Sequence, residues 1–80
     1  MLDYEMMYNS ERAKCFTEAH GIERYRAACE NFAEDPSYEG AIVCDVIGDV
    51  LKEQFNVSGK KLAEIEAEAY KKAEMWGGKK

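Results

Sequence analysis

The pattern of apolar and polar positions is most pronounced at residues 40–55, which read GAIVCDVIGDVLKEQF. On a helical projection the apolar residues of this stretch cover one broad surface, and its acids form a narrow row beside that surface. A helix that is apolar over so wide an arc has to be surrounded by neighbouring helices. We therefore expect residues 40–55 to form the central helix of the fold.

A β-strand is the alternative interpretation of residues 41–47, because this segment is rich in the β-branched residues that favour strands. The other segments contain no second run that is typical of a strand. A lone strand would leave its backbone donors and acceptors unpaired. Residues 49–55 also keep helical spacing, so the pattern as a whole favours a helix.

Apolar residues recur at helical spacing in three further segments, at about residues 4–20, 22–34 and 59–76. Together with the central helix they predict an all-α protein, a compact bundle of about four helices. No stretch is typical of a linker between domains, so residues 1–80 are expected to form a single helical domain. The apolar side of the first helix is expected to consist of Tyr4, Met7, Tyr8, Cys15, Phe16 and Ala19. The apolar side of the last helix is expected to consist of Leu62, Ile65, Ala69, Ala73 and Trp76.

Capping residues predict where these helices end. Gly21 is expected to follow the first helix, which His20 completes, because glycine adopts the left-handed conformation of a helix C-terminus without strain. Asp35 and Pro36 end the second helix and are expected to cap and open the third. Ser58 is expected to cap the fourth.

The small size of the chain limits its stability. A domain of 80 residues buries only about 60–65% of the surface that its unfolded chain exposes, so a disulfide, a metal or a second subunit would add stability. Cys15, Cys29 and Cys44 fall on the apolar sides of three different helices, and none belongs to a CxxC pair. This pattern favours buried thiols in a reducing compartment, with a disulfide or a reactive thiol as the alternatives.

The chain lacks the sequence signals of secretion and of membrane insertion. Its first residues contain no apolar segment of signal-peptide length, and no run approaches the roughly 20 apolar residues that span a bilayer. We therefore expect no membrane partner and a cytoplasmic location, in a cell or in an infected host cell.

No motif for catalysis or for a cofactor is present. A metal site needs several converging ligands, but the chain has one histidine and three scattered cysteines. His20 lies five residues after Cys15, so their side chains would leave a helix in different directions. Gly59 and the lysines after it lack the upstream glycine and the hydroxyl residue of a phosphate-binding loop. We expect a protein that is not an enzyme, with no catalytic residue, no cofactor and no metal.

Direct nucleic-acid binding is also not expected. The first two helices resemble a helix-turn-helix in outline only, and the net charge of the chain is −5. DNA binding needs positive charge that displaces counterions from the phosphates.

The acidic residues are distributed unevenly along the chain. Between residues 30 and 53 there are seven acids, opposed by Lys52 alone. These acids are the candidate protein-binding residues: Glu30, Glu34, Asp35, Glu39, Asp45, Asp49 and Glu53. The last three are spaced four apart, so they form a row that advances about 6 Å per step along a helix, near the spacing of successive phosphates in a nucleic-acid strand. The alternative interpretation is a solvated helix face that keeps a small protein soluble.

Size and charge together favour a non-enzymatic protein-binding module that docks its acidic face on a basic surface of another protein. One form is an inhibitor that imitates nucleic acid, as small acidic phage proteins do against bacterial defence systems; the analogy is one of size and charge alone. The alternative is a structural subunit or adaptor that completes its core by homo- or hetero-oligomerisation. In that case Tyr38, Met75 and Trp76 would lie near the contact.

Overall fold

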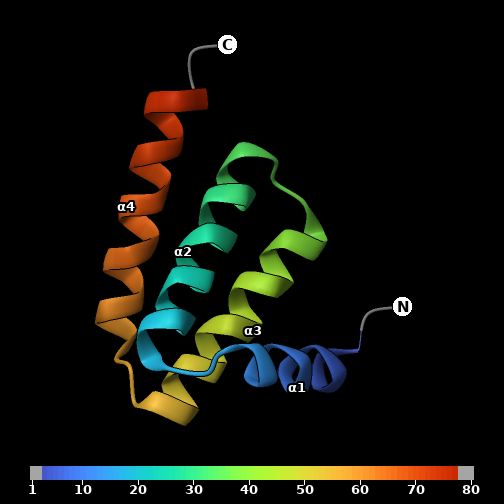
Figure 1. Cartoon of the computed structure of the whole chain (residues 1–80). Coiled ribbons are helices and arrows are strands. Elements are labelled where there is room, and N and C mark those ends of the chain that lie inside the picture. Colours follow the sequence, from blue (N-terminus) through green and yellow to red (C-terminus); the bar gives the residue numbers. More distant parts are fainter. Residues whose placement is uncertain (1–2, 78–80) are drawn as a thin grey trace.

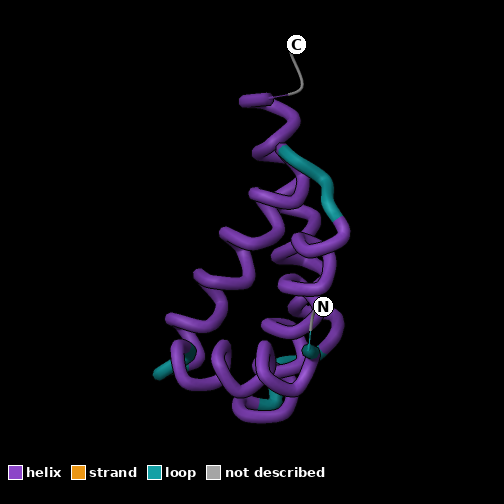
Figure 2. The backbone as a smooth tube through the Cα atoms, turned by 90° about the vertical axis from the view of Figure 1, so that its right-hand side faces the viewer, coloured by secondary structure: helices purple, strands orange, loops and turns teal. Residues whose placement is uncertain are grey.

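The computed structural model describes the backbone of residues 3–77 and the side chains of residues 3–72. This part of the chain forms four helices and no strand: α1 (Tyr4–Lys14), α2 (Glu18–Glu34), α3 (Tyr38–Phe55) and α4 (Gly59–Gly77) (Figure 1). Figure 2 shows that the described loops are short turns between these helices. The prediction of an all-α bundle is confirmed, and residues 40–55 are helical.

Three of the helices form the main body, and α1 lies across it. α2 packs against both α3 and α4, while α1 packs against α3. Figure 1 shows α2, α3 and α4 running up and down side by side, and α1 crossing the lower half of α3. α3 therefore lies between α1 and α2, which agrees with its prediction as the central helix.

The core is built mainly where α2 meets α3 and α4. α3 has six buried residues and α2 has three. The core cluster consists of Tyr25, Cys29, Cys44, Ile47, Leu51, Val57, Leu62, Ile65 and Ala69. The predicted apolar side of the fourth helix is confirmed for Leu62, Ile65 and Ala69, and the side chains of its remaining members, Ala73 and Trp76, lie outside the described residues.

The predicted boundary between the first two helices is wrong. α1 ends at Lys14, and α2 begins at Glu18 with Thr17 as its N-cap, whose hydroxyl accepts a hydrogen bond from the His20 N–H at 3.1 Å. Gly21 lies inside α2, where it is buried. A Cβ atom at this position would lie 2.6 Å from Cδ2 of the buried Leu51, so a larger residue would force this side chain to shift, whereas glycine permits the close approach of α2 to α3.

Further expectations change with this boundary. Of the residues predicted for the apolar side of the first helix, Cys15 is the C-cap of α1 and Ala19 is an exposed residue of α2. Phe16 does not belong to the apolar side of a helix, because it lies in the turn and its side chain is 79% exposed. His20 does not complete the first helix but lies in the first turn of α2.

The predicted cap of the third helix is also wrong. Ser37 is the N-cap of α3, and its hydroxyl accepts a hydrogen bond from the N–H of Gly40 at 3.0 Å. Asp35 instead closes α2, because its N–H donates to the carbonyl of Asn31 at 2.9 Å. The Ser58 cap of α4 is confirmed by the hydrogen bond from the Lys61 N–H to its hydroxyl, at 3.1 Å.

Candidate protein-binding surface

The acidic row of α3 lies beside α1. Asp49 accepts a hydrogen bond from the hydroxyl of Tyr4, and Glu53 accepts one from the hydroxyl of Tyr8 at 2.7 Å. Within residues 3–72, neither these two acids nor Asp45 forms an ion pair. Two acids of the row thus accept hydrogen bonds from neutral donors, and no cation within residues 3–72 forms an ion pair with the row to compensate its negative charge.

The spacing of the two tyrosines matches the spacing of the two acids. Tyr4 and Tyr8 are four residues apart on α1, as Asp49 and Glu53 are on α3, and the tyrosine rings stack with centroids 6.3 Å apart. The hydrogen bond to Asp49 raises the pKa of Tyr4 to about 12, with smaller contributions from burial and from the charge of Asp49. Tyr4 therefore remains a neutral donor at neutral pH.

A hollow of about 540 Å³ between α3 and α4 gathers acids from both helices. Asp45, Asp49 and Glu66 line it, and Lys52 is the cation in its wall. Three carboxylates against one ammonium group give the hollow a negative potential, which favours a cationic group of a ligand or partner. This hollow is the candidate site.

The apolar wall of the hollow includes groups that stay uncharged. Tyr25, Cys44 and Leu62 are among its lining residues. Burial raises the pKa of the Tyr25 phenol and of the Cys44 thiol above their usual values. Both groups are therefore protonated at neutral pH, and the charge of the hollow comes from its carboxylates and Lys52.

Glu66 is the member of this site that sequence reasoning missed. It lies on α4, outside the segment in which the acids are concentrated. Its position, four residues after Leu62 and three before Ala69, is the signal that would have placed it at the edge of the buried stripe.

The other predicted site residues do not join this hollow. Glu30 forms an ion pair with Lys72 of α4 at 3.6 Å. Glu34 and Asp35 line a separate hollow of about 300 Å³ at the turn between α2 and α3. Glu39 is exposed in the first turn of α3. Of the seven predicted acids, the structure brings Asp45 and Asp49 together in the hollow, and it places Glu53 one turn further along, in a recess beside Tyr8.

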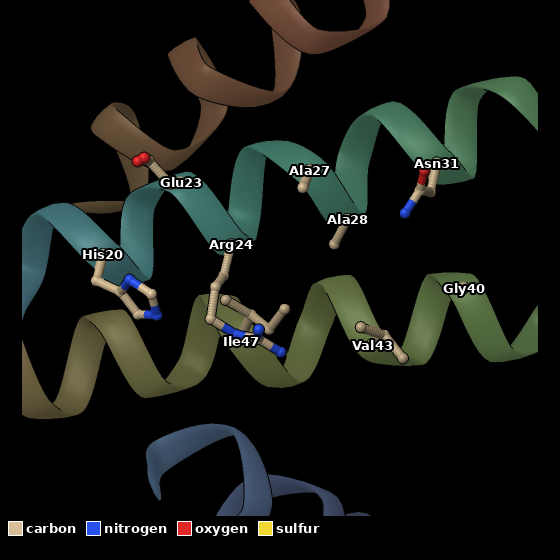
Figure 3. Close-up of a pocket in the computed structure, with 9 residues that line it drawn as sticks. All are labelled: His20, Glu23, Arg24, Ala27, Ala28, Asn31, Gly40, Val43 and Ile47. Carbon is tan, nitrogen blue, oxygen red and sulfur yellow. The ribbon is translucent and has the colours of Figure 1, made fainter. Parts of the chain in front are cut away.

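A second, less charged groove lies between α2 and α3 (Figure 3). Its volume is about 460 Å³. Ala28 and Val43 are among its apolar lining residues, while Glu23 and Arg24 contribute one charge of each sign. Arg24 is held by Glu11 of α1, since both its Nε and its Nη2 donate to Glu11 Oε1, at 3.1 and 2.5 Å.

The cysteines are free and buried, as the sequence predicts. Burial raises the pKa of all three thiols, that of Cys29 to about 12, so they are protonated at neutral pH. Among the side chains of residues 3–72, no group of three histidine, cysteine or acidic residues is arranged to hold a metal ion.

The described residues contain no helix with the length and the hydropathy that crossing a membrane requires. Comparison of the chain with protein-family models, with curated proteins and with solved structures finds no match.

Proposed function

We propose that this protein is a non-enzymatic binding module. Its hollow between α3 and α4 binds a basic surface of another protein. The observation that carries this proposal is the convergence of Asp45, Asp49 and Glu66 on one hollow that has Lys52 as its cation. The three acids come from two helices, so the charge is concentrated by packing and is not simply spread along one solvated helix face.

The hollow suits a lysine or arginine side chain of the partner. Its apolar wall, which includes Tyr25 and Leu62, offers contact for the aliphatic stem of such a side chain. The charged end then reaches the carboxylates of Asp45 and Glu66, with hydrogen bonds that are stronger than neutral ones because both partners are ionised. Tyr4 already donates to Asp49, so a partner that uses Asp49 fully has to displace this hydroxyl.

One specific form of this function is an inhibitor that imitates nucleic acid. The row of Asp45, Asp49 and Glu53 runs along α3 with steps of about 6 Å, and its tyrosine partners are uncharged. Such a row supports docking on a nucleic-acid-binding surface, as in the phage proteins that block defence systems. The proposed partner is then a cytoplasmic protein that handles DNA or RNA.

The test compares two double variants with the same change in net charge. Asp45→Lys with Glu66→Lys reverses two acids of the hollow that form no hydrogen bond to α1. Glu18→Lys with Glu64→Lys is the matched control, because both acids are exposed and neither lines the hollow. Partners are captured from an extract of the native host, identified by mass spectrometry, and their affinity for each variant is measured with the purified partner.

We expect the hollow variant to lose the partner and the control to retain it, with binding that weakens as salt rises from about 0.1 to 1 M because ions screen exposed charges. Equal binding by wild type and both variants would contradict the proposal. Equal loss in both variants would mean that only net charge matters and that the hollow is not the site.

A second candidate function, completion of the fold by another chain, is favoured by one observation. Phe16 is 79% exposed and lies beside the groove between α2 and α3. The residues Met75 and Trp76, which the sequence also suggested for such a contact, have side chains outside the described residues.

A further inference from the structure

Two of the three buried cysteines face each other across the contact between α2 and α3. These two helices are joined by a short turn and run side by side in opposite directions (Figure 1). Tyr25 of α2 meets Gly48 of α3, since a Cβ atom on Gly48 would lie 3.4 Å from Cε1 of Tyr25. Cys29 lies one turn after Tyr25, and Cys44 lies one turn before Gly48. One turn along the antiparallel pair from that contact therefore brings Cys29 opposite Cys44.

The two helices approach closely on both sides of the cysteine pair. Gly40 and Gly48 lie one turn before and one turn after Cys44, and both face α2. A Cβ atom on Gly40 would lie 3.3 Å from Cδ1 of Phe32, so the same register continues to the connecting turn. A disulfide between two helices requires Cβ atoms about 3.5–4.5 Å apart, and glycines on both sides allow this approach.

The two thiols also act on each other. Both belong to the core cluster, in which Cys29 has no exposed surface and Cys44 is 8% exposed. Burial is the largest cause of the raised pKa of Cys29, and the charge and the hydrogen bond of Cys44 are the next. Burial likewise raises the pKa of Cys44, and the hydrogen bond with Cys29 opposes this rise. The two sulfur atoms are therefore within hydrogen-bonding distance of each other.

One member of the pair is open to a small reagent. Cys44 is among the lining residues of the hollow of about 540 Å³ between α3 and α4, which is large enough for a peroxide molecule. Cys15 is separate from the pair, because its Cβ would lie 3.5 Å from a Cβ on Gly21, eight residues before Cys29 on α2. Eight residues of a helix correspond to about 12 Å.

We propose that Cys29 and Cys44 are a redox-sensitive pair, which hydrogen peroxide converts to a disulfide that ties α2 to α3. This proposal does not depend on a partner for the acidic hollow.

The reaction has two steps. The Cys44 sulfur attacks one oxygen of the peroxide, so that an S–O bond forms, the O–O bond breaks, and one water leaves with the thiol proton. The Cys29 sulfur then attacks the Cys44 sulfur, so that the S–S bond forms, the S–O bond breaks, and a second water leaves with the remaining thiol proton. The two sulfurs lose two electrons, and the peroxide gains them. Because both thiols are protonated at neutral pH, the first step is slow and the pair responds to sustained exposure.

The first test maps the disulfide in the full chain. The reduced protein is treated with excess hydrogen peroxide overnight, unfolded, labelled with N-ethylmaleimide and digested with trypsin. No lysine or arginine lies between Arg26 and Lys52, so Cys29 and Cys44 share the peptide 27–52, whereas Cys15 lies in the peptide 15–24. Mass spectrometry should find the peptide 27–52 lighter by two hydrogens and unlabelled, and the peptide 15–24 labelled.

The unfolded chain is the matched control for proximity. Cys15 and Cys29 are 14 residues apart and Cys29 and Cys44 are 15 apart, so the two pairs close loops of nearly equal entropy when the chain is unfolded. Peroxide in guanidinium should therefore form both disulfides in comparable amounts. The folded protein should favour Cys29–Cys44 at least about tenfold, because only the packing of α2 on α3 distinguishes the pairs. The variant Cys15→Ala should oxidise like the wild type.

The second test asks whether the disulfide fits the native packing. Closing a loop of 15 residues should lower the unfolding equilibrium constant about a hundredfold, because it restricts the unfolded chain. Guanidinium denaturation of the oxidised protein measures this change, and dithiothreitol should reverse it. Cys44→Ala, treated with peroxide in the same way, is the control, and its midpoint should not rise.

Three results would overturn the proposal. The first is a folded protein in which the peptide 27–52 stays fully labelled after the exposure to peroxide. The second is a folded protein that pairs Cys15 with Cys29 as often as it pairs Cys29 with Cys44. The third is an oxidised protein that is no more stable than the reduced one.

Discussion

The two faces of α3 are covered in different ways. Toward α2 and α4, Ile47 and Leu51 are buried within a continuous apolar cluster. Toward α1, Val46 and Val50 are fully buried, but no residue of α1 is itself buried. Besides covering these valines, the α1 layer forms polar bonds through three side chains, Tyr4, Tyr8 and Glu11.

This difference separates a stable body from a weakly attached layer. Burial of apolar surface contributes about 25 cal/mol per Å², whereas a hydrogen bond contributes only about 0.5–1.5 kcal/mol net and less where it is exposed. α1 should therefore open at a lower free energy than α2, α3 and α4 do. Since α1 also contacts Asp49 and Glu53, its attachment would influence how freely the acidic row could meet the proposed partner.

The largest effect is expected in the cluster between α2, α3 and α4. Leu51→Ala should lower the free energy of unfolding by about 2–5 kcal/mol, because it removes buried methyl groups and leaves a cavity. Met6→Ala on α1 is the control, since Met6 is largely exposed and its loss should change stability by less than about 0.5 kcal/mol. Chemical denaturation, monitored by circular dichroism, measures the free energy of unfolding of both variants. Similar losses in the two variants would mean that α1 is part of the cooperative core.

The next effect distinguishes two glycines in the helix contacts. Gly21→Ala should destabilise the protein by about 1–3 kcal/mol, because the new Cβ would lie 2.6 Å from Leu51 Cδ2. Gly48→Ala should stabilise it by about 0.5–1 kcal/mol, because its Cβ would lie at ordinary contact distances, 3.4 Å from Tyr25 Cε1 and 3.6 Å from Leu62 Cδ1. Denaturation midpoints, compared at equal m-values, give the change in the free energy of unfolding for each variant. Changes of the same sign would contradict the packing described for α2 and α3.

A smaller effect is expected where α1 meets the acidic row. Tyr4→Phe combined with Tyr8→Phe removes the hydroxyl donors to Asp49 and Glu53 and should cost at most about 1 kcal/mol per bond, since both sites are partly exposed. Amide hydrogen exchange should become faster in α1 and stay unchanged in α2–α4. Uniformly faster exchange in all four helices would show instead that the tyrosine bonds stabilise the whole fold.

The smallest effect concerns pH. The pKa of Tyr4 is raised from 10.0 to about 12 by its bond to Asp49, so the protonated hydroxyl is favoured in the folded state. The stabilisation from this group is complete below pH 10 and is lost as the pH rises through about 12, because the phenolate cannot donate and is repelled by the carboxylate. NMR titration of the Tyr4 ring measures the pKa, and Asp49→Asn should return it toward 10. An unchanged pKa in that variant would contradict the assigned cause.

Much of the fold follows from local patterns. The helical positions of α3 and the buried stripe of Leu62, Ile65 and Ala69 agree with the periodicity of the sequence. The boundary between α1 and α2 does not follow from it, because a glycine that ends a helix and a glycine that allows close packing look alike in sequence. Thr17, followed by Glu18, was the local signal for the correct boundary, since threonine is a favoured N-cap and an acid suits the first turn.

The sequence by itself determined that this protein is a helical bundle and that Asp45, Asp49 and Glu53 share one side of α3, because helical periodicity is a local property. The tertiary structure decided which groups meet those acids. It brings Glu66 of α4 into the hollow lined by Asp45 and Asp49, and it places Tyr4 against Asp49, 45 residues away in the chain. Such contacts depend on how whole helices pack, and helix packing is set by the shapes of several segments at once, which no single segment reveals.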